Sequence, residues 1–258
     1  MEQSKRRQYL IKALLKEKGL QDKETELPGT EEEQKRWLRG LMNVRMPKAV
    51  STEFEKIQDE YLQEELAKKG VVRLEDLQPV QPGLYLWRGD ITRLAVDAIV
   101  NAANSGMLGC FVPCHGCIDN AIHSAAGIQL RQECARIMQE QREPEPTGRA
   151  KITPAYNLPC RYVLHTVGPI VSGRLTEKHR RQLADCYRSC LELAADNRVK
   201  SIAFCCISTG EFHFPQEEAA KIAVRTVKDF MQTDQRIERV IFNVFKQEDY
   251  DIYQKLLG

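Results

Sequence analysis

The first eighty residues combine many charged positions with apolar residues at helical spacing. Leu10 and Leu14 recur with the period of a helix. Phe54, Ile57 and Tyr61 form a second apolar stripe of the same kind. We expect helices at about 4–18, 31–44 and 51–70, with a break at 27–30. Because charged side chains are so frequent here, we expect residues 1–80 to be a helical extension packed on a larger domain.

Beyond residue 80 the pattern alternates between short apolar runs and amphipathic stretches. We expect strands at 84–88, 98–101, 162–167, 201–207 and 239–245. We expect helices at 119–127 (resumed to 138), 177–196, 216–231 and 248–257. Such alternation is typical of an α/β sheet with helices on both faces, so residues 81–258 are predicted to be one α/β domain.

The amino-acid composition is that of a globular protein without a membrane-spanning helix. Hydrophobic residues make up 42% and charged residues 29%, an ordinary globular balance, and the net charge is only +2. The longest uninterrupted apolar run is Ile202 to Ile207, far short of the ~18 residues of a membrane helix. The N-terminus has no signal-peptide pattern. We therefore expect a cytoplasmic protein whose partners are neither nucleic acid nor membrane.

The 9 cysteines all lie between Cys110 and Cys206. Their odd number and uneven distribution argue against a disulfide scaffold and for a reducing compartment. Three of them fall with a histidine in the loop after the strand at 98–101, which reads NAANSGMLGCFVPCHGCIDN from residue 101. Thiolate and imidazole together are typical zinc ligands, so Cys110, His115 and Cys117 are candidates. Three protein ligands leave one coordination position open, as in catalytic zinc sites.

Cys114 leaves other interpretations open. As a fourth ligand it would close the site and make it structural. With Cys117 it would form a redox dithiol, although the surrounding pattern lacks the usual start of a thioredoxin-like unit. A chance cluster of free cysteines is the third interpretation.

Other polar residues follow the predicted strands, where open α/β sheets bind ligands. Asp119 stands at the start of a predicted helix, where it would be an N-cap or a carboxylate at the mouth of a site. The turn at Ser208, Thr209 and Gly210 offers backbone N–H groups to an anion, but such a turn is a weak signal by itself. His123 is interpreted as structural.

Taken together, these segments resemble the macrodomain family of ADP-ribose-binding modules. The matching pieces are Gly89-Asp-Ile-Thr92, Asp97-Ala-Ile-Val-Asn-Ala-Ala-Asn104, Asp119-Asn-Ala-Ile-His123 and Ile207-Ser-Thr-Gly-Glu-Phe212. Gly109-Cys-Phe-Val-Pro-Cys-His-Gly-Cys117 replaces the glycine run of many members and resembles the zinc-containing microbial branch. The resemblance implies a three-layer α/β/α macrodomain with a mixed central sheet and an N-terminal helical extension.

The resemblance also implies roles for single residues. Cys110, His115 and Cys117 would hold one Zn²⁺ per chain, with Cys114 on an unspecified position. Asp90 would accept a hydrogen bond from the adenine amino group beside the Ile91 amide. Asn104 and Asp119 would act at the distal ribose as catalytic residues. The remaining ADP-ribose contacts would come from Cys117, Ile118, Ser208, Thr209, Gly210, Glu211 and Phe212.

The implied activity is that of a protein-ADP-ribose hydrolase that removes mono-ADP-ribose from modified proteins and releases ADP-ribose. An ester to Asp or Glu is the favoured linkage, since it is easier to break than an N-glycosidic bond. A sirtuin-like ADP-ribosyltransferase would be the functional counterpart. The alternatives are a reader that binds ADP-ribose without cleaving it, and a structural or redox protein whose cysteines act as thiols.

Overall fold

A computed structural model describes residues 1–20, 27 and 29–258. The break predicted at 27–30 includes Pro28, which lies outside the described residues. The helices are α1 (Gln3–Glu17), α2 (Glu31–Asn43), α3 (Thr52–Lys69), α4 (Ile118–Ala126), α5 (Ile128–Gln141), α6 (Glu177–Asp196), α7 (Gln216–Thr233) and α8 (Gln247–Leu257), with 3₁₀ turns at Leu74–Asp76 and Ile91–Arg93. The strands are β1 (Val72–Arg73), β2 (Pro79–Gln81), β3 (Leu84–Arg88), β4 (Leu94–Ala95), β5 (Ala98–Ala103), β6 (Ala150–Pro154), β7 (Tyr162–Val167), β8 (Ser201–Phe204) and β9 (Arg239–Val244).

The central sheet has seven strands in the order β2-β3-β9-β8-β5-β7-β6. Its two outer strands are antiparallel to their neighbours, and the five inner strands are parallel to one another. The sheet is therefore mixed, as expected. β1 and β4 pair separately as a short parallel ladder.

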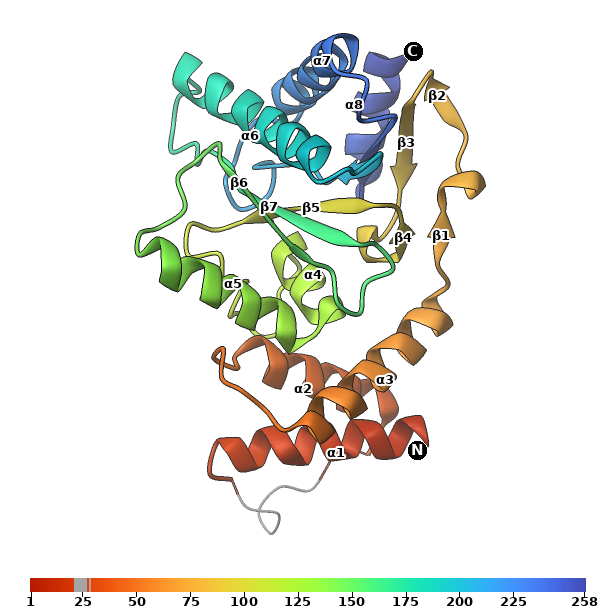
Figure 1. Cartoon of the computed structure of the whole chain (residues 1–258), viewed down its shortest axis with the longest axis vertical. Coiled ribbons are helices and arrows are strands. Elements are labelled where there is room, and N and C mark those ends of the chain that lie inside the picture. Colours follow the sequence, from red (N-terminus) through yellow and green to blue (C-terminus); the bar gives the residue numbers. More distant parts are fainter. Residues whose placement is uncertain (21–26, 28) are drawn as a thin grey trace.

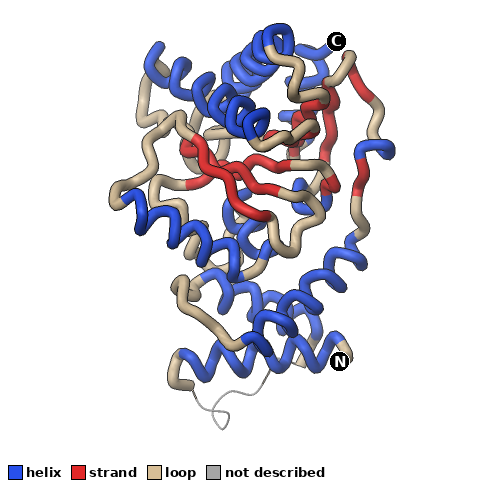
Figure 2. The backbone as a smooth tube through the Cα atoms, in the orientation of Figure 1, coloured by secondary structure: helices blue, strands red, loops and turns tan. Residues whose placement is uncertain are grey.

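Helices cover both faces of this sheet. α6, α7 and α8 lie on one side and α4 and α5 on the other, which gives three layers (Figure 1). The tube view shows the red strands enclosed between these blue helices (Figure 2). The parallel strands β5, β8 and β9 consist mainly of apolar, buried residues, as in sheets covered on both faces. The expected α/β/α architecture is confirmed.

The first three helices form a second, smaller unit, which we call the helical module (α1–α3). Its core holds Leu10, Leu14, Leu38 and Phe54, and it is completed by Ile128 at the start of α5. Both of its later helices are capped: Thr30 forms a capping box with Glu33 ahead of α2, and Ser51 accepts a hydrogen bond from the Phe54 amide ahead of α3. The module packs against the α4 side of the sheet (Figure 1).

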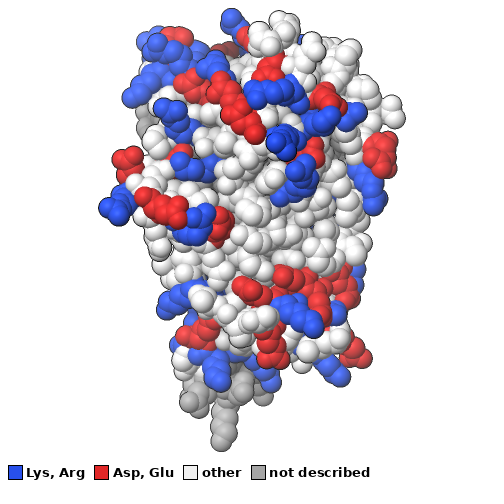
Figure 3. All heavy atoms as spheres, viewed as in Figure 1, with Lys and Arg blue, Asp and Glu red and all other residues white. Residues whose placement is uncertain are grey.

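Charges of both signs are interspersed over the face shown in Figure 3. This agrees with the net charge of +2. In the described part of the chain, every helix is too short or too polar to cross a bilayer.

Several predicted boundaries were wrong. The strand predicted at 201–207 ends at Phe204, and buried Cys205 and Ile207 lead into a turn. Edge strand β6 was missed because its sequence, AKITP, has no continuous apolar run and ends in Pro154, which cannot donate to a ladder. Asp119 is not an N-cap: Cys117 caps α4, its Sγ accepting a hydrogen bond from the Asn120 amide.

Candidate functional site

A cleft of about 1020 Å³ opens at the carboxyl ends of the parallel strands. Its walls come from the loops that follow β3, β5, β7, β8 and β9. Ligands of open α/β sheets bind at this edge. The volume is at the upper end of the ~300–1,000 Å³ of small-molecule sites.

Every residue that the sequence singled out for the site lines this one cleft. These residues are Asp90, Ile91, Asn104, Cys110, His115, Cys117, Ile118, Asp119, Ser208, Thr209, Gly210, Glu211 and Phe212. They come from three loops that are far apart in sequence. The fold therefore brings them together, whereas their individual roles remain predictions.

Asp119 lies at the base of the cleft, and its carboxylate is held by two amides. Asn101 Nδ2 donates to Oδ1 at 2.8 Å, and Asn104 Nδ2 donates to Oδ2 at 3.4 Å. Asp119 is only 5% exposed. Burial raises the pKa of Asp119 to about 6, while the two amides and the Arg131 charge act in the opposite direction.

Behind Asp119 lies a group of buried side chains, His123, Cys134 and His165, which we call the core cluster. His123 Nε2 is 3.5 Å from Asp119 Oδ1. Burial lowers the pKa of His123 well below its usual value, so the contact is to a neutral ring. Within the described residues neither nitrogen of His123 has a hydrogen-bond partner. The sequence interpretation of His123 as structural did not anticipate this proximity to Asp119.

His165 joins the same network from the neighbouring strand. It pairs with Asn101 in the β5–β7 register. Its Nδ1 lies 3.2 Å from Asn101 Nδ2, and its Nε2 lies 3.0 Å from Thr153 Oγ1. Because the Asn101 amide nitrogen is a donor, Nδ1 is the acceptor, which leaves Nε2–H as the donor to Thr153.

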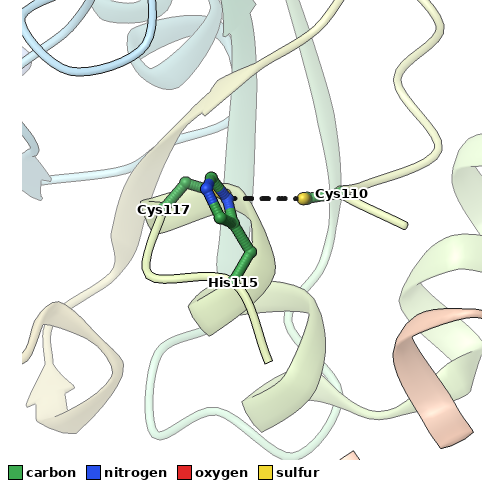
Figure 4. A group of neighbouring side chains, drawn as sticks. All are labelled: Cys110, His115 and Cys117. Carbon is green, nitrogen blue, oxygen red and sulfur yellow. Dashed lines mark hydrogen bonds between the residues drawn. The ribbon is translucent and has the colours of Figure 1, made fainter. Parts of the chain in front are cut away.

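The loop after β5 gathers Cys110, His115 and Cys117, which we call the loop cluster. One ligand atom from each lies within 4.8 Å of the others. The His115 ring points toward the Cys110 sulfur, with Nδ1 to Sγ at 3.6 Å (Figure 4). The other ring nitrogen, Nε2, lies 3.6 Å from Glu211 Oε1 across the cleft.

These residues fit a zinc ion. Zn–S and Zn–N bonds of about 2.3 and 2.0 Å at a tetrahedral angle separate the two ligand atoms by about 3.5 Å. The distance from Cys110 Sγ to His115 Nδ1, 3.6 Å, is close to this value. A carboxylate facing the second nitrogen of a ligating histidine is a common supporting arrangement, and Glu211 occupies that place. Two thiolates would also neutralise the charge of a divalent cation.

Without a cation this arrangement disfavours thiolates. Burial raises the pKa of Cys117 to about 12, and the neighbouring Cys110 adds to the shift. A bound metal deprotonates a coordinating thiol outright.

Cys114 is turned away from the loop cluster. Its thiol donates to the Arg36 carbonyl at 3.1 Å, and its amide donates to Asn43 Oδ1 at 2.9 Å. Both partners belong to α2. The arrangement separates Cys114 from the three candidate ligands and from Cys117 as a dithiol partner, and all nine cysteines carry free thiols.

The turn after β8 approaches β7 closely. A Cβ on Gly168 would come within 1.9 Å of Ser208 Oγ, so only glycine fits there. The left-handed residue of the turn is Ser208, with φ 66°, and not Gly210. Ser208 is held in this conformation by the turn around it, since its carbonyl accepts from the Phe214 amide at 3.0 Å.

Sequence reasoning missed several residues of the cleft. Asn243 is the next-to-last residue of β9, and Phe245 directly follows the strand with 78% exposure. The rule that selected the other loops would have found them, had it been applied to β9. Arg39 of α2 also lines the cleft. No local pattern marks Arg39, because its place depends on how the helical module packs.

Comparison with known proteins agrees with this architecture. The family described as Macro domain matches residues 100–223. A protein-ADP-ribose hydrolase of Treponema medium is 57% identical over 100% of both chains. The hydrolase of the same name from Staphylococcus aureus strain MSSA476 is 45% identical over 97% of this chain and 94% of its own.

A solved structure, the Trypanosoma brucei macrodomain in complex with ADP-ribose, is 35% identical. It superimposes with a TM-score of 0.67 and covers 82% of this chain and 92% of its own. The fold, the position of the cleft and the full-length relatives lead to one conclusion. This chain belongs to the macrodomain family.

Proposed function

We propose that this chain is a zinc-dependent hydrolase that releases mono-ADP-ribose from modified proteins, and that it cuts an ester to Asp or Glu. The observation that carries this proposal is the loop cluster on the wall of the cleft that also contains Asp119. Full-length relatives named protein-ADP-ribose hydrolase support the reaction class. The partners are the modified protein and the released ADP-ribose. A sirtuin-like ADP-ribosyltransferase would attach the group that this chain removes.

The order of the strands in the sheet indicates which end of the cleft would hold the adenine of ADP-ribose and which the distal ribose. Asp90 and Phe245 follow the neighbouring strands β3 and β9, and the loop cluster and Asp119 follow β5. We assign the adenine to the first pair and the distal ribose to the second. The Ser208 turn follows β8, which lies between these strands in the sheet order, so we assign the diphosphate to this turn.

The residues around the distal ribose have separate tasks. Asp119, held by Asn101 and Asn104, orients the attacking water and accepts its proton. Its burial keeps competing bulk water away from the carboxylate. A zinc ion at the loop cluster would supply a Lewis acid to polarise an oxygen of the ribose or its ester.

The reaction balances with water as the only co-substrate. Water adds across the ester bond, the protein regains its Asp or Glu carboxyl group, and ADP-ribose leaves with a free hydroxyl. Asp119 passes the proton that it took from water to the departing ribose oxygen, which becomes the free hydroxyl, and the regained carboxyl group of the modified protein then releases its own proton to solvent.

The test follows turnover and binding on the same protein. Purified protein of known zinc content is incubated with a substrate mono-ADP-ribosylated on Glu or Asp, then stripped with chelator and reloaded. We expect release of ADP-ribose that is lost on stripping and returns with zinc, while affinity for free ADP-ribose changes little. Hydrolysis that survives complete metal removal would contradict the zinc role. Tight ADP-ribose binding with no release would favour a reader.

Cys114→Ser is the matched control for this test. It changes a thiol in the same loop that faces α2 and not the loop cluster. We expect normal release from this variant and normal recovery after reloading.

A further inference from the structure

The loop that carries Cys110 and His115 has little structure of its own. Between the end of β5 and the start of α4 it forms turns and bends only. Its internal backbone bonds are few, such as the His115 amide to the Val112 carbonyl at 3.2 Å. Something outside the loop must therefore hold the candidate ligands at their observed separation.

Helix α2 of the helical module contacts this loop directly. Asn43 Oδ1 accepts from the Cys114 amide at 2.9 Å, and Arg39 Nη2 donates to the His115 carbonyl at 3.0 Å. These two contacts fix the chain on both sides of the peptide bond that enters His115.

Arg39 also reaches the loop through Asn120. Its Nη2 and Nε donate to Asn120 Oδ1 at 2.7 and 3.2 Å. Asn120 is fully buried; its Nδ2 donates to the Val112 carbonyl at 3.0 Å, and its amide donates to Cys117 Sγ at 3.4 Å. One arginine of α2 is thus linked directly to the His115 backbone and, through Asn120, to the Val112 carbonyl and the Cys117 sulfur.

Arg131 of α5 also bonds both to the end of α2 and to the loop that carries the candidate ligands. Its Nη1 donates to the Met42 and Asn43 carbonyls at the end of α2, at 3.2 and 2.6 Å, and to the Arg45 carbonyl just beyond the helix, at 2.6 Å. On the loop side, Nε donates to the Leu108 carbonyl at 2.7 Å and Nη2 to the Cys110 carbonyl at 3.4 Å.

The surroundings of Arg131 make this link rigid. Its guanidinium lies 4.2 Å from the Phe111 ring centroid, and the residue is only 5% exposed. The carbonyls at the end of a helix suit a buried cation, because they carry the negative end of the helix dipole.

We propose that the helical module is part of the metal centre: through its own Arg39 and Asn43, and through Arg131 of α5, which bonds to both α2 and the loop, it holds the loop so that Cys110 and His115 meet a zinc ion already in place. These are positioning residues, since they act on the ligands through backbone and through Asn120. The inference rests on the proposed zinc site and assigns the module a task beyond packing. A loop held in this way gives up less conformational freedom when the metal binds.

The test compares two arginines of the module in the full-length chain. Arg39→Ala removes the contacts to His115 and Asn120. Arg6→Ala is the control: Arg6 joins α1 to α3 through Glu60 and Glu64, at 3.0 and 2.6 Å, so its loss weakens the module without touching the loop. Zn²⁺ affinity is measured by competition with a chromophoric chelator, and thermal unfolding is recorded for the metal-free proteins.

We expect Arg39→Ala to weaken zinc binding by about 10- to 100-fold, the range for groups that orient metal ligands. Asn43→Ala should weaken zinc binding in the same direction, whereas Arg6→Ala should lower Tm and leave zinc affinity within about twofold of wild type. Wild-type zinc affinity in both Arg39→Ala and Asn43→Ala, with only Tm reduced, would overturn the inference and leave the proposed function intact. A wild-type protein that binds no zinc would refute the metal centre itself.

Discussion

Two groups of cysteine and histidine lie near Asp119, and their surroundings decide what each can bind. The loop cluster is half-buried on the wall of the cleft, whereas the core cluster is fully buried behind it. In the core cluster both nitrogens of His165 are already paired, with Asn101 and Thr153. In the loop cluster His115 faces a thiol on one side and a carboxylate on the other.

The two clusters also differ in the negative charge that they can offer to a divalent cation. Two thiolates in the loop cluster offset a divalent cation. The core cluster has a single thiol, Cys134, and burial raises its pKa to about 12. A divalent cation in the core cluster would therefore leave positive charge unpaired in the protein interior, where burying such charge costs free energy. The loop cluster therefore suits the proposed zinc ion, whereas in the core cluster His165 is held in neutral hydrogen bonds and, within the described residues, His123 has no hydrogen-bond partner.

Asp119 borders both clusters, and its substitution has the largest expected effect. Asp119→Asn keeps the shape of the side chain and removes the proton acceptor. We expect the rate of ADP-ribose release to fall by about 10²- to 10⁴-fold, with ADP-ribose affinity changed much less. Single-turnover release and calorimetric binding measure the two quantities. A variant that keeps a third of the wild-type rate would show that Asp119 is not the base.

Removing a ligand from the loop cluster comes next. We expect Cys117→Ser to lose zinc and to lower release by more than about 100-fold, beyond the effect of groups that only orient ligands. Cys134→Ser in the core cluster should leave the zinc content unchanged. Metal analysis measures the zinc content of both variants. Loss of zinc from Cys134→Ser together with full zinc in Cys117→Ser would contradict the assignment of the site to the loop cluster.

The core cluster should matter for stability instead. His165→Leu removes the partner of two buried groups, Asn101 and Thr153. An unsatisfied buried polar group costs about 1–3 kcal/mol, so we expect the free energy of unfolding at pH 7.5 to fall by about 2–4 kcal/mol. Urea unfolding measures this change. An unchanged midpoint would mean that the network contributes nothing to stability.

The smallest effect is a dependence on pH. Burial lowers the pKa of His165 to about 3, whereas an unfolded histidine has a pKa of about 6.5. As pH falls below about 6.5, only the unfolded chain gains this proton, so wild-type stability decreases. The His165→Leu variant has no histidine at this position, so its stability does not decrease for this reason.

The stability difference between wild type and His165→Leu should therefore shrink by about 1.4 kcal/mol from pH 7.5 to pH 5.5. Urea unfolding at the two pH values measures it. A difference that stays constant would show that His165 is protonated in the folded protein or is not buried.

The sequence predicted what depends on local pattern. Strand-helix alternation located the sheet, and the loops after β3, β5 and β8 supplied every predicted residue of the cleft. Edge strand β6 was missed because polar residues interrupt its apolar ones, so that it lacks the continuous apolar run that marked the inner strands.

Long-range packing could not be predicted from the sequence. The orientation of Cys114 depends on the Arg36 carbonyl, far away in the chain. The places of Arg39 and Arg131 depend on how the helical module meets the loop. The N-cap of α4 is Cys117, although the sequence had offered Asp119 for this position. The helix begins one residue before Asp119, so the Asp119 carboxylate is free to face Asn101 and Asn104.

Metal stoichiometry tests the central claim most directly. Zinc is quantified per chain in wild type, Cys117→Ser, Cys114→Ser and Cys134→Ser after purification without added metal. The account predicts about one zinc per chain in wild type, Cys114→Ser and Cys134→Ser, and almost none in Cys117→Ser. A wild-type protein without zinc, or a Cys117→Ser variant that keeps its full zinc content, would contradict it.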